Sequence, residues 1–526
     1  MSDNNEKTVR AATIMMVITL IGKILGLVRE TLLAANYGSG MEAIAFQTAS
    51  RIPRVFFDAI FASAISASFI PIFNESLEKK GKKSAFEFSN KFITIIFLVT
   101  AVLTIVGMLF GYQFTELFAK DLDTETKVLA TKLLYIMFPT VVFTGIAYSF
   151  VGILQSFEEF TIPAALSIVS NGIIIIYYLF FNDTMGVYGL TIAFLIGWAM
   201  QAVMQIPSLI KKGYRYRPSF KFREDDSIKK VLILMLPVMV GTWVQPINIT
   251  INTRFASDLY EGAGISAIDY ANNLYTIIVG VVVLSVANVI FPRLSRMTAN
   301  DEKSSVFDTV IMTVRILSYL IIPMTAGVMA LSSPIISLVY QRGAFTEFDV
   351  AITSSALFFF SLGMFGYGMQ TILSRAFYAE QNGKIPFIAG LVSIVVNIVL
   401  CQILVDKMSV AGLALASAIS STIYGFALYI PLKRRYKDRS TNGFAVSIIK
   451  MIICALVMTA VVVPMRNMLW NADASFILKV IVVGIIVVVG AAVYIIMSRI
   501  IKLYEAEAAF DFAKKVLKKN HRGTEE

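Results

Sequence analysis

Long apolar runs alternate with short polar segments along the whole chain. Each run has about 20 residues or more, the length at which an α-helix crosses the hydrocarbon core of a bilayer. Polar residues, glycine and proline interrupt the chain between the runs. The pattern predicts fourteen membrane-spanning helices, at residues 11–35, 41–75, 85–112, 126–155, 160–182, 186–211, 227–257, 264–294, 304–331, 347–379, 385–405, 409–433, 443–466 and 475–501.

The composition agrees with an all-α integral membrane protein. Of the 526 residues, 57% are hydrophobic and only 15% are charged, whereas about 25% of the residues of soluble domains are charged. The net charge of +11 is distributed over the short segments between apolar runs, so it indicates no nucleic acid partner. Cys401 and Cys454 lie in apolar runs and form no disulfide framework. The only histidine, His521, lies in the polar tail, which argues against an imidazole-based site.

The basic residues alternate between loops and predict the orientation. Every second loop is rich in lysine and arginine, as in "KKGKK", "KKGYRYRPSFKFREDDSIKK", "RLSRMTANDEK" and "KRRYKDR", and the acidic "QSFEEF" is an exception. The loops between them, such as "NDTMGV", "DLYEGAG" and "DKM", are poor in basic residues. Because basic loops stay on the cytoplasmic side, both termini are predicted to be cytoplasmic.

The two halves of the chain resemble each other. Pro163 aligns with Pro386, and Gly189 aligns with Gly412, in both cases with a separation of about 223 positions. Six helices per copy return the chain to the same side, so the copies form parallel lobes related by a pseudo-twofold axis along the membrane normal. The predicted parts are an N-terminal six-helix lobe (1–212), a basic cytoplasmic linker (213–226), a C-terminal six-helix lobe (227–435), two extra helices (443–501) and a polar cytoplasmic tail (502–526).

Several charged residues lie inside the predicted spans. The cations are Lys23, Arg29, Arg51, Arg54 and Arg254, and the acids are Glu30, Asp58 and Asp269. A charge that faces lipid costs about 2.5–3.5 kcal/mol on insertion scales, so these side chains are expected to face a shared hydrated cavity. The cations outnumber the acids, which predicts a net-positive cavity that suits an anion such as a phosphate. We interpret Arg29 and Arg254 as a pseudo-symmetric pair sharing one pyrophosphate, and Asp58 as a residue that orients Arg54.

Structural roles are the alternative for single residues of this set. Arg54 and Asp58, four positions apart, can form a helix-stabilising pair, and Lys23 and Glu30 can close a helix bundle. Arg51 and Arg254 can extend to the membrane surface.

The motif content favours a transporter over an enzyme. The sequence has no G-x-x-x-x-G-K-[ST], G-x-S-x-G or H-E-x-x-H motif and no zinc-ligand spacing. A lipid-phosphate transferase is the alternative enzyme class, but it needs clustered acids, and the only tight cluster, "REDD", lies among lysines and arginines. A scaffold without transport leaves the cations in the spans unexplained.

The segments "GKILGLVRETLLAANYGSG", "FIPIF", "INTRFAS", "YANNLY" and "LVYQRGAFTEFD" resemble the MurJ (MviN) lipid II flippases of the multidrug/oligosaccharidyl-lipid/polysaccharide exporter superfamily. The resemblance implies alternating-access movement of the undecaprenyl-pyrophosphate-linked peptidoglycan precursor across the bacterial inner membrane. It also implies a lipid groove formed by the last two helices. Two alternative functions are a flippase for another polyprenyl-linked oligosaccharide and a drug exporter of the same superfamily.

The resemblance also assigns residues and partners. Lys23, Arg29 and Glu30 match the charged first helix of the family, whereas Phe57, Asp58 and Asn273 stand where better-known members have basic residues. The implied partners are the lipid-linked pyrophosphate glycan, membrane lipids and other cell-wall synthesis proteins. The resemblance implies no cofactor apart from a coupling cation such as sodium. The polar side chains able to serve as its ligands are Asn248, Asn252 and Asn397.

Overall fold

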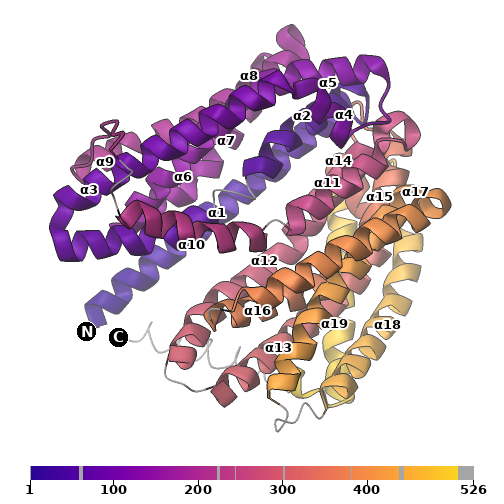
Figure 1. Cartoon of the computed structure of the whole chain (residues 1–526). Coiled ribbons are helices and arrows are strands. Elements are labelled where there is room, and N and C mark those ends of the chain that lie inside the picture. Colours follow the sequence, from indigo (N-terminus) through magenta and orange to yellow (C-terminus); the bar gives the residue numbers. More distant parts are fainter. Residues whose placement is uncertain are drawn as a thin grey trace. The chain divides into compact units, whose positions relative to one another are not determined.

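The computed structural model describes residues 2–57, 63–221, 226–242, 244–299, 303–380, 382–436 and 443–507 (Figure 1). These residues form helices joined by short connections, and no strand occurs among them, which confirms the predicted all-α class. The elements are α1 (Ser2–Tyr37), α2 (Met41–Phe57), α3 (Ser63–Leu109), α4 (Gly111–Phe118), α5 (Thr124–Met137), α6 (Thr140–Ser156), α7 (Thr161–Phe180), α8 (Asn182–Val203), α9 (Ile206–Lys211), α10 (Asp226–Thr242), α11 (Val244–Ala256), η2 (Tyr260–Gly262), α12 (Ala263–Ala299), α13 (Lys303–Ala330), α14 (Ser332–Tyr340), α15 (Glu347–Ser361), α16 (Met364–Ala379), α17 (Lys384–Arg435), α18 (Phe444–Leu469) and α19 (Phe476–Ile500).

Within the described residues, nine helices are long and apolar enough to cross a membrane. A tenth is present if α15 and α16, which are bent by 47° relative to each other, form one span. These helices cover the predicted spans from 85–112 to 186–211 and from 264–294 to 475–501. The remaining three predicted spans correspond to α1, to α2 with the start of α3, and to α10 with α11. Each of these includes residues or side chains outside the described part, so the number fourteen stays a prediction.

The chain packs into two compact units. The first consists of Met1–Ser266 with Arg342–Thr346, and the second consists of Ala267–Gln341 with Glu347–Glu526. The borders of these units follow packing, whereas the predicted domain borders follow the sequence repeat. The predicted domains therefore stay a prediction.

In the first unit α1 packs against α7, α2 against α5, and α3 against both α6 and α10. Aromatic side chains pack the two arms of α3, which meet at the non-helical Gly81, against each other, since the ring of Phe69 lies 4.8 Å from that of Phe92 and 5.4 Å from that of Phe88. Gly152 of α6 lets this helix approach closely, since a Cβ there would lie 2.7 Å from the Phe69 ring. The two arms of α3 and α6 thus share one apolar core.

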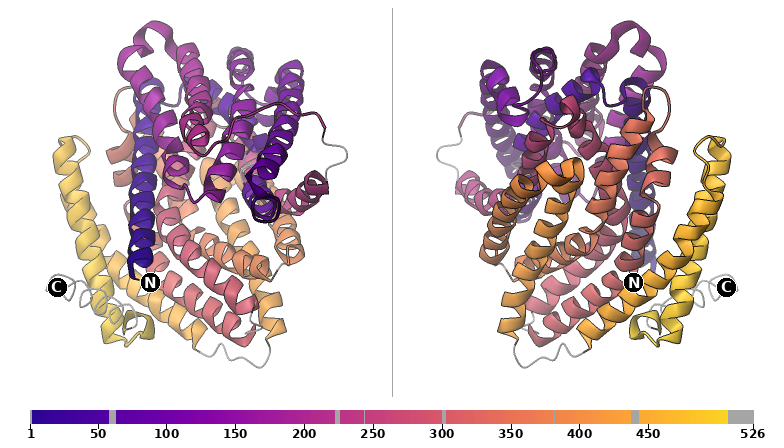
Figure 2. Two further views of the ribbon diagram at one scale, coloured as in Figure 1. Left: turned by 90° about the vertical axis from the view of Figure 1, so that its left-hand side faces the viewer. Right: turned by 90° about the vertical axis from the view of Figure 1, so that its right-hand side faces the viewer.

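In the second unit α17 packs against α15 and α16, and α13 packs against α16 and α18. The last two helices, α18 and α19, run side by side and are drawn in yellow in Figure 2. Tyr494 of α19 donates a hydrogen bond to the carbonyl of Tyr319 in α13, at 3.1 Å, and Met451 and Met458 of α18 complete this core. The last two helices are therefore packed onto the unit by a continuous apolar core.

One backbone feature recurs at the spacing of the predicted repeat. Gly186, near the start of α8, leaves the helical conformation with φ 51° and ψ −150°. Ser409, inside α17, does so with φ 51° and ψ −131°. The two residues are about 223 positions apart, the offset found in the sequence. The break at Ser409 divides α17 into the two arms predicted as 385–405 and 409–433.

Candidate functional site

Arg29 and Glu30 form a polar cluster between α1 and α7. Nη1 of Arg29 donates a hydrogen bond to Oδ1 of Asn171 at 3.1 Å, and its Nη2 forms an ion pair with Glu30. Asn171 also donates from Nδ2 to the carbonyl of Gly22 at 3.2 Å. The two helices approach closely here, because a Cβ at Gly22 would lie 2.3 Å from Oγ of Ser167. The carboxylate and the amide together orient the Arg29 guanidinium.

Lys23 differs from Arg29 in its surroundings. The side chain is half-buried in α1, and the described residues show neither a hydrogen bond nor an ion pair for it. Its ammonium group therefore remains able to bind an anion, whereas the charge of Arg29 is partly offset by Glu30.

Arg51 of α2 reaches α11. Its Nη1 donates a hydrogen bond to Oγ1 of Thr253, a residue that is only 1% exposed. Thr253 in turn donates to the carbonyl of Ile249 at 2.9 Å, which fixes the direction of its hydroxyl group. Arg54, one turn further along α2, is exposed. Asp58 lies outside the described residues, so the predicted pairing of Arg54 with Asp58 stays a prediction.

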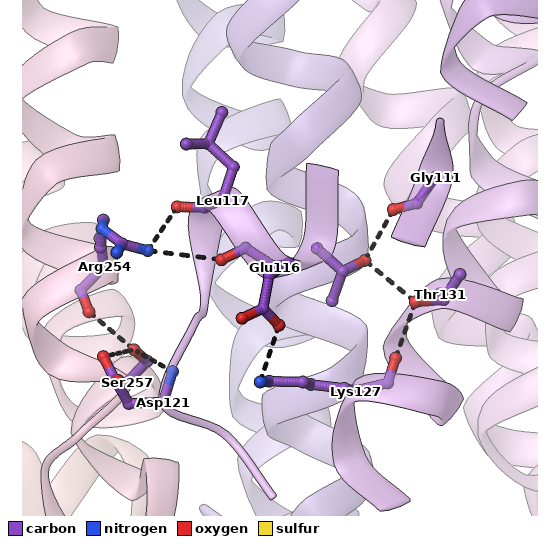
Figure 3. Close-up of polar contacts among 9 residues, drawn as sticks. Gly111, Glu116, Leu117, Asp121, Lys127, Thr131, Arg254 and Ser257 are labelled. Carbon is purple, nitrogen blue, oxygen red and sulfur yellow. Dashed lines mark hydrogen bonds and ion pairs between the residues drawn. The ribbon is translucent and has the colours of Figure 1, made fainter. Parts of the chain in front are cut away.

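Arg254, the last arginine of the predicted set, lies at the end of α11 and contacts the end of α4 (Figure 3). Its Nη1 donates to the carbonyls of Glu116 and Leu117, at 3.3 and 2.9 Å. The last carbonyls of a helix lack partners within the helix and carry partial negative charge, so a guanidinium satisfies and stabilises them. Beside this contact, Glu116 forms an ion pair with Lys127 of α5 at 2.8 Å.

The first unit therefore places the predicted cations in two groups. One group is centred on α1 and α7, and the other joins α2, α4 and α11. No contact within the described residues links Arg29 to Arg254, and the shared-pyrophosphate hypothesis stays a prediction. In the second unit, Asp269 of α12 is buried at 9% exposure, and Asn273 is half-buried with no hydrogen bond among the described residues.

Sequence reasoning missed two polar partners. Asn171 holds Arg29, and Thr253 holds Arg51. A signal for Asn171 exists, because an asparagine in the apolar run "SIVSNGIIII" is costly unless it has partners. Thr253 offers no comparable signal, because threonine is common in membrane helices and can satisfy its hydroxyl within its own helix.

The proposed coupling-cation residues give no defined ligand set. Asn252 and Asn397 are buried, at 3% and 0% exposure, and Asn248 is half-buried. Among the residues with described positions, no group of three or more His, Cys, Asp or Glu side chains could hold a metal ion. The coupling cation stays a prediction.

Comparison with known proteins decides the family. The sequence model described as "Lipid II flippase MurJ" matches residues 33–504. The chain belongs to the lipid II flippase MurJ family. Among MurJ relatives, a Rickettsia prowazekii protein named "Probable lipid II flippase MurJ" is 27% identical over 94% of this chain and 98% of its own length. A Buchnera aphidicola protein of the same name is 30% identical over 92% of this chain and 95% of its own.

Solved structures agree with the MurJ assignment. The structure titled "Lipid II flippase MurJ, inward closed conformation" is similar with a TM-score of 0.78 and 29% identity, and it covers 93% of this chain and 98% of that chain. An inward-facing multidrug resistance MATE transporter of the MOP superfamily has a TM-score of 0.65 at 12% identity, covering 81% of this chain and 98% of that chain. This second similarity shows a common fold only.

These comparisons confirm the resemblance derived from the motifs. They establish a membrane transporter of the MurJ family rather than an enzyme, and a multi-pass protein of the bacterial inner membrane.

Proposed function

We propose that this protein moves lipid II, the undecaprenyl-pyrophosphate-linked precursor of peptidoglycan, from the inner to the outer leaflet by alternating access. The family match over residues 33–504 carries the proposal, and similarity to a solved MurJ structure over 93% of the chain supports it. The lipid-linked pyrophosphate glycan is the substrate, and the surrounding membrane lipids are the second class of partner.

The cations of the first unit supply the chemistry that this substrate needs. A pyrophosphate has several negatively charged oxygens, and charge-assisted hydrogen bonds to such oxygens are stronger than neutral ones. Lys23 offers an ammonium group, and Arg29 offers a guanidinium held in place by Asn171 and Glu30. We assign substrate binding to the predicted set, which is Lys23, Arg29, Glu30, Arg51, Arg54, Arg254 and Asn273, with Asp58 and Asp269 in support.

The remaining features of the proposal come from the sequence. The alternation of basic loops supports cytoplasmic termini. The lack of a nucleotide-binding motif supports transport driven by the membrane potential or by a cation gradient, with sodium as the cation considered. Other cell-wall synthesis proteins are proposed as partners, because they would supply the precursor and consume it.

Lys23 gives the sharpest test. The purified protein is reconstituted in vesicles, and both its affinity for lipid II and the movement of lipid II between leaflets are measured for the native protein, Lys23→Gln and Lys23→Arg. A charge-assisted contact contributes about 1.5–3 kcal/mol, so Lys23→Gln should weaken lipid II binding about tenfold to a hundredfold, and Lys23→Arg should retain most of it. The Tm of Lys23→Gln should stay close to that of the native protein, because Lys23 has no partner among the described residues.

Lys407→Gln is the matched control, since Lys407 is an exposed lysine of the second unit. Equal flipping by the native protein and Lys23→Gln would remove Lys23 from the substrate path. Movement of a different polyprenyl-linked oligosaccharide without movement of lipid II would contradict the substrate assignment while keeping the transport class.

A further inference from the structure

The segment after α9 lies extended on α3 and is held there by hydrogen bonds. We call residues 212–221 the strap. Oδ1 of Asn90 in α3 accepts a hydrogen bond from the hydroxyl of Tyr214 at 2.9 Å and another from the backbone N–H of Arg217 at 3.1 Å. One turn further, Oγ1 of Thr94 accepts from the backbone N–H of Ser219 at 3.1 Å. The strap therefore has a fixed register on the helix.

This register determines which side chains of the strap are exposed. Tyr214 is 2% exposed, and its ring lies 5.2 Å from that of Phe86 in α3. Aromatic side chains further along the strap are exposed, with Tyr216 at 39% and Phe220 at 66%. The basic side chains beside these rings are also exposed, and they are Arg215, Arg217 and Lys221. Exposed rings and cations thus alternate along a segment whose backbone is fixed.

The strap lies near one edge of the membrane. Asn90 and Thr94 belong to the span Ser68–Leu109 and lie on either side of Lys91, whereas the exposed large apolar side chains of this arm begin at Phe97. At about 1.5 Å per residue, Asn90 and Thr94 lie about 10 and 5 Å before Phe97 along the helix axis. Figure 1 shows α9, from which the strap continues, beside α3. The boundary between headgroups and hydrocarbon lies at this level, and aromatic residues concentrate there.

We propose that the strap binds the headgroups of anionic phospholipids at the membrane surface. Its exposed cations complement the negative phosphates, and Phe220 is placed where rings enter the boundary between headgroup and acyl chain. The ring of Tyr216 is partly exposed, and its hydroxyl lies 3.0 Å from Oγ1 of Thr94, which adds to the contacts that hold the strap on α3. The assignment to the cytoplasmic leaflet rests on the proposed orientation of the chain, and lipid binding itself does not rest on the proposed substrate.

A fluorescent probe at Phe220 tests the proposal in the full-length protein. Phe220→Cys is made in a Cys401→Ala, Cys454→Ala background and labelled with a dye whose emission moves to the blue in apolar surroundings. The protein is reconstituted in vesicles of phosphatidylcholine alone or with phosphatidylglycerol added. We expect a blue shift on addition of phosphatidylglycerol, and we expect high salt to reverse it, because screening weakens contacts between exposed charges.

Charge removal gives the matched comparison. The combined variant Arg215→Gln, Arg217→Gln, Lys221→Gln should lose the lipid-dependent shift. The control removes three exposed cations of the second unit, by Lys384→Gln, Lys433→Gln and Arg434→Gln, and should keep the shift. Equal loss in both variants would attribute the shift to the overall positive charge and would overturn a specific surface. The Tm of each variant shows that it is folded.

Two further outcomes would also overturn the proposal. An emission that is identical in both kinds of vesicle would show that Phe220 does not contact anionic lipid. Abolition of the blue shift by inorganic phosphate, at an ionic strength where chloride does not abolish it, would be the second such outcome. That result would indicate a site for free phosphate. A membrane-impermeant quencher reports on which side the probe lies, and lipid II movement is measured separately, so failure of this proposal and failure of the proposed function are distinguishable.

Discussion

At the scale of single residues, the arginines of the first unit differ in their partners. Arg29 is bound to a carboxylate and an amide, Arg51 to a hydroxyl group, and Arg254 to backbone carbonyls. A carboxylate partly offsets a guanidinium's charge, whereas a carbonyl, which carries only a partial charge, offsets less of it. Arg254 therefore combines a structural contact with a charge that remains available to an anion.

The contact between Arg254 and α4 predicts a stability effect. Arg254→Gln leaves the carbonyls of Glu116 and Leu117 without this donor, so we expect a loss of about 1–3 kcal/mol in the free energy of unfolding. Arg254→Lys should recover part of the loss, because an ammonium group keeps the charge but lacks the planar fork. Thermal unfolding in detergent measures both variants, and an unchanged Tm for Arg254→Gln would contradict the capping role.

A double-mutant cycle separates this structural role from substrate binding. Arg29 and Arg254 share no partner among the described residues, so the stability losses of Arg29→Gln and Arg254→Gln should be additive. If both guanidinium groups bind one pyrophosphate, their effects on lipid II affinity should be non-additive, with each single variant weakened about tenfold to a hundredfold. Additive affinity losses, or an unchanged affinity in Arg254→Gln, would exclude the shared ligand.

The sequence shows which charged residues lie in the spans, but it does not predict the hydrogen-bond partners of their side chains. Asn171 lies 142 positions from Arg29, and Glu116 lies 138 positions from Arg254. A contact of this separation depends on which helices pack together and at what rotation, and a single sequence does not reveal that. Even the pairing of Arg29 with Glu30 is unexpected from helix geometry, because adjacent residues point about 100° apart and only their long side chains bring the charges together.

At the scale of elements, the loop within "YQRGAFTEFD" belongs to the first unit, although α14 and α15 on either side of it belong to the second. The N–H of Ala344 donates to the carbonyl of Ala35 at 2.8 Å, which satisfies a free carbonyl in the last turn of α1. Gly343 and Gly38 have φ values of 59° and 57°. A Cβ at Gly343 would lie 2.1 Å from the Ala35 carbonyl oxygen, so the backbones touch only because both residues are glycine.

This contact predicts that Gly343→Ala destabilises the protein. The new Cβ would meet the Ala35 carbonyl, and alanine at a positive φ costs about 1–2 kcal/mol by itself. We therefore expect a clear fall in Tm. Gly172→Ala is the control, because no atom lies within 4 Å of its Cβ position in α7. Alanine also has a higher helix propensity than glycine, so this variant should be at least as stable as the native protein. A Tm for Gly343→Ala equal to or above that of Gly172→Ala would show that the loop does not depend on this contact.

The elements that the sequence predicts well are those defined by local pattern. The apolar runs predict the ends of the spans formed by α5 with α6, α7, α12, α13, α15 with α16, and α17 to α19 to within about five residues. The reason is that a run of about 20 apolar residues has few alternatives to a membrane helix. The kinks at Gly186 and Ser409 coincide with the breaks between predicted spans. The apolar pattern does not predict α4, α9 and α14 as separate helices. It places them within neighbouring spans or loops, because the pattern does not reveal a turn inside an apolar run.

At the scale of the whole molecule, the internal repeat is the feature that the sequence reveals most directly. Its offset reappears in the backbone breaks of α8 and α17, at Gly186 and Ser409. The grouping of α10 and α11 with the first unit was not predictable from the repeat. The repeat assigns these helices to the second lobe by sequence, whereas their packing against α3, α2 and α4 places them in the first unit.

This difference makes the predicted span 227–257, which contains α10 and α11, the decisive element of the topology. It is the one predicted span between Arg215 and Glu261, which are both exposed. Single cysteines at these two positions, in a Cys401→Ala, Cys454→Ala background, are treated with a membrane-impermeant maleimide on intact cells. The distribution of lysine and arginine predicts that Glu261→Cys is labelled from outside and that Arg215→Cys is labelled only after the membrane is permeabilised. Labelling of both from outside would mean that α10 and α11 do not together cross the membrane, and every helix downstream would then have the opposite direction.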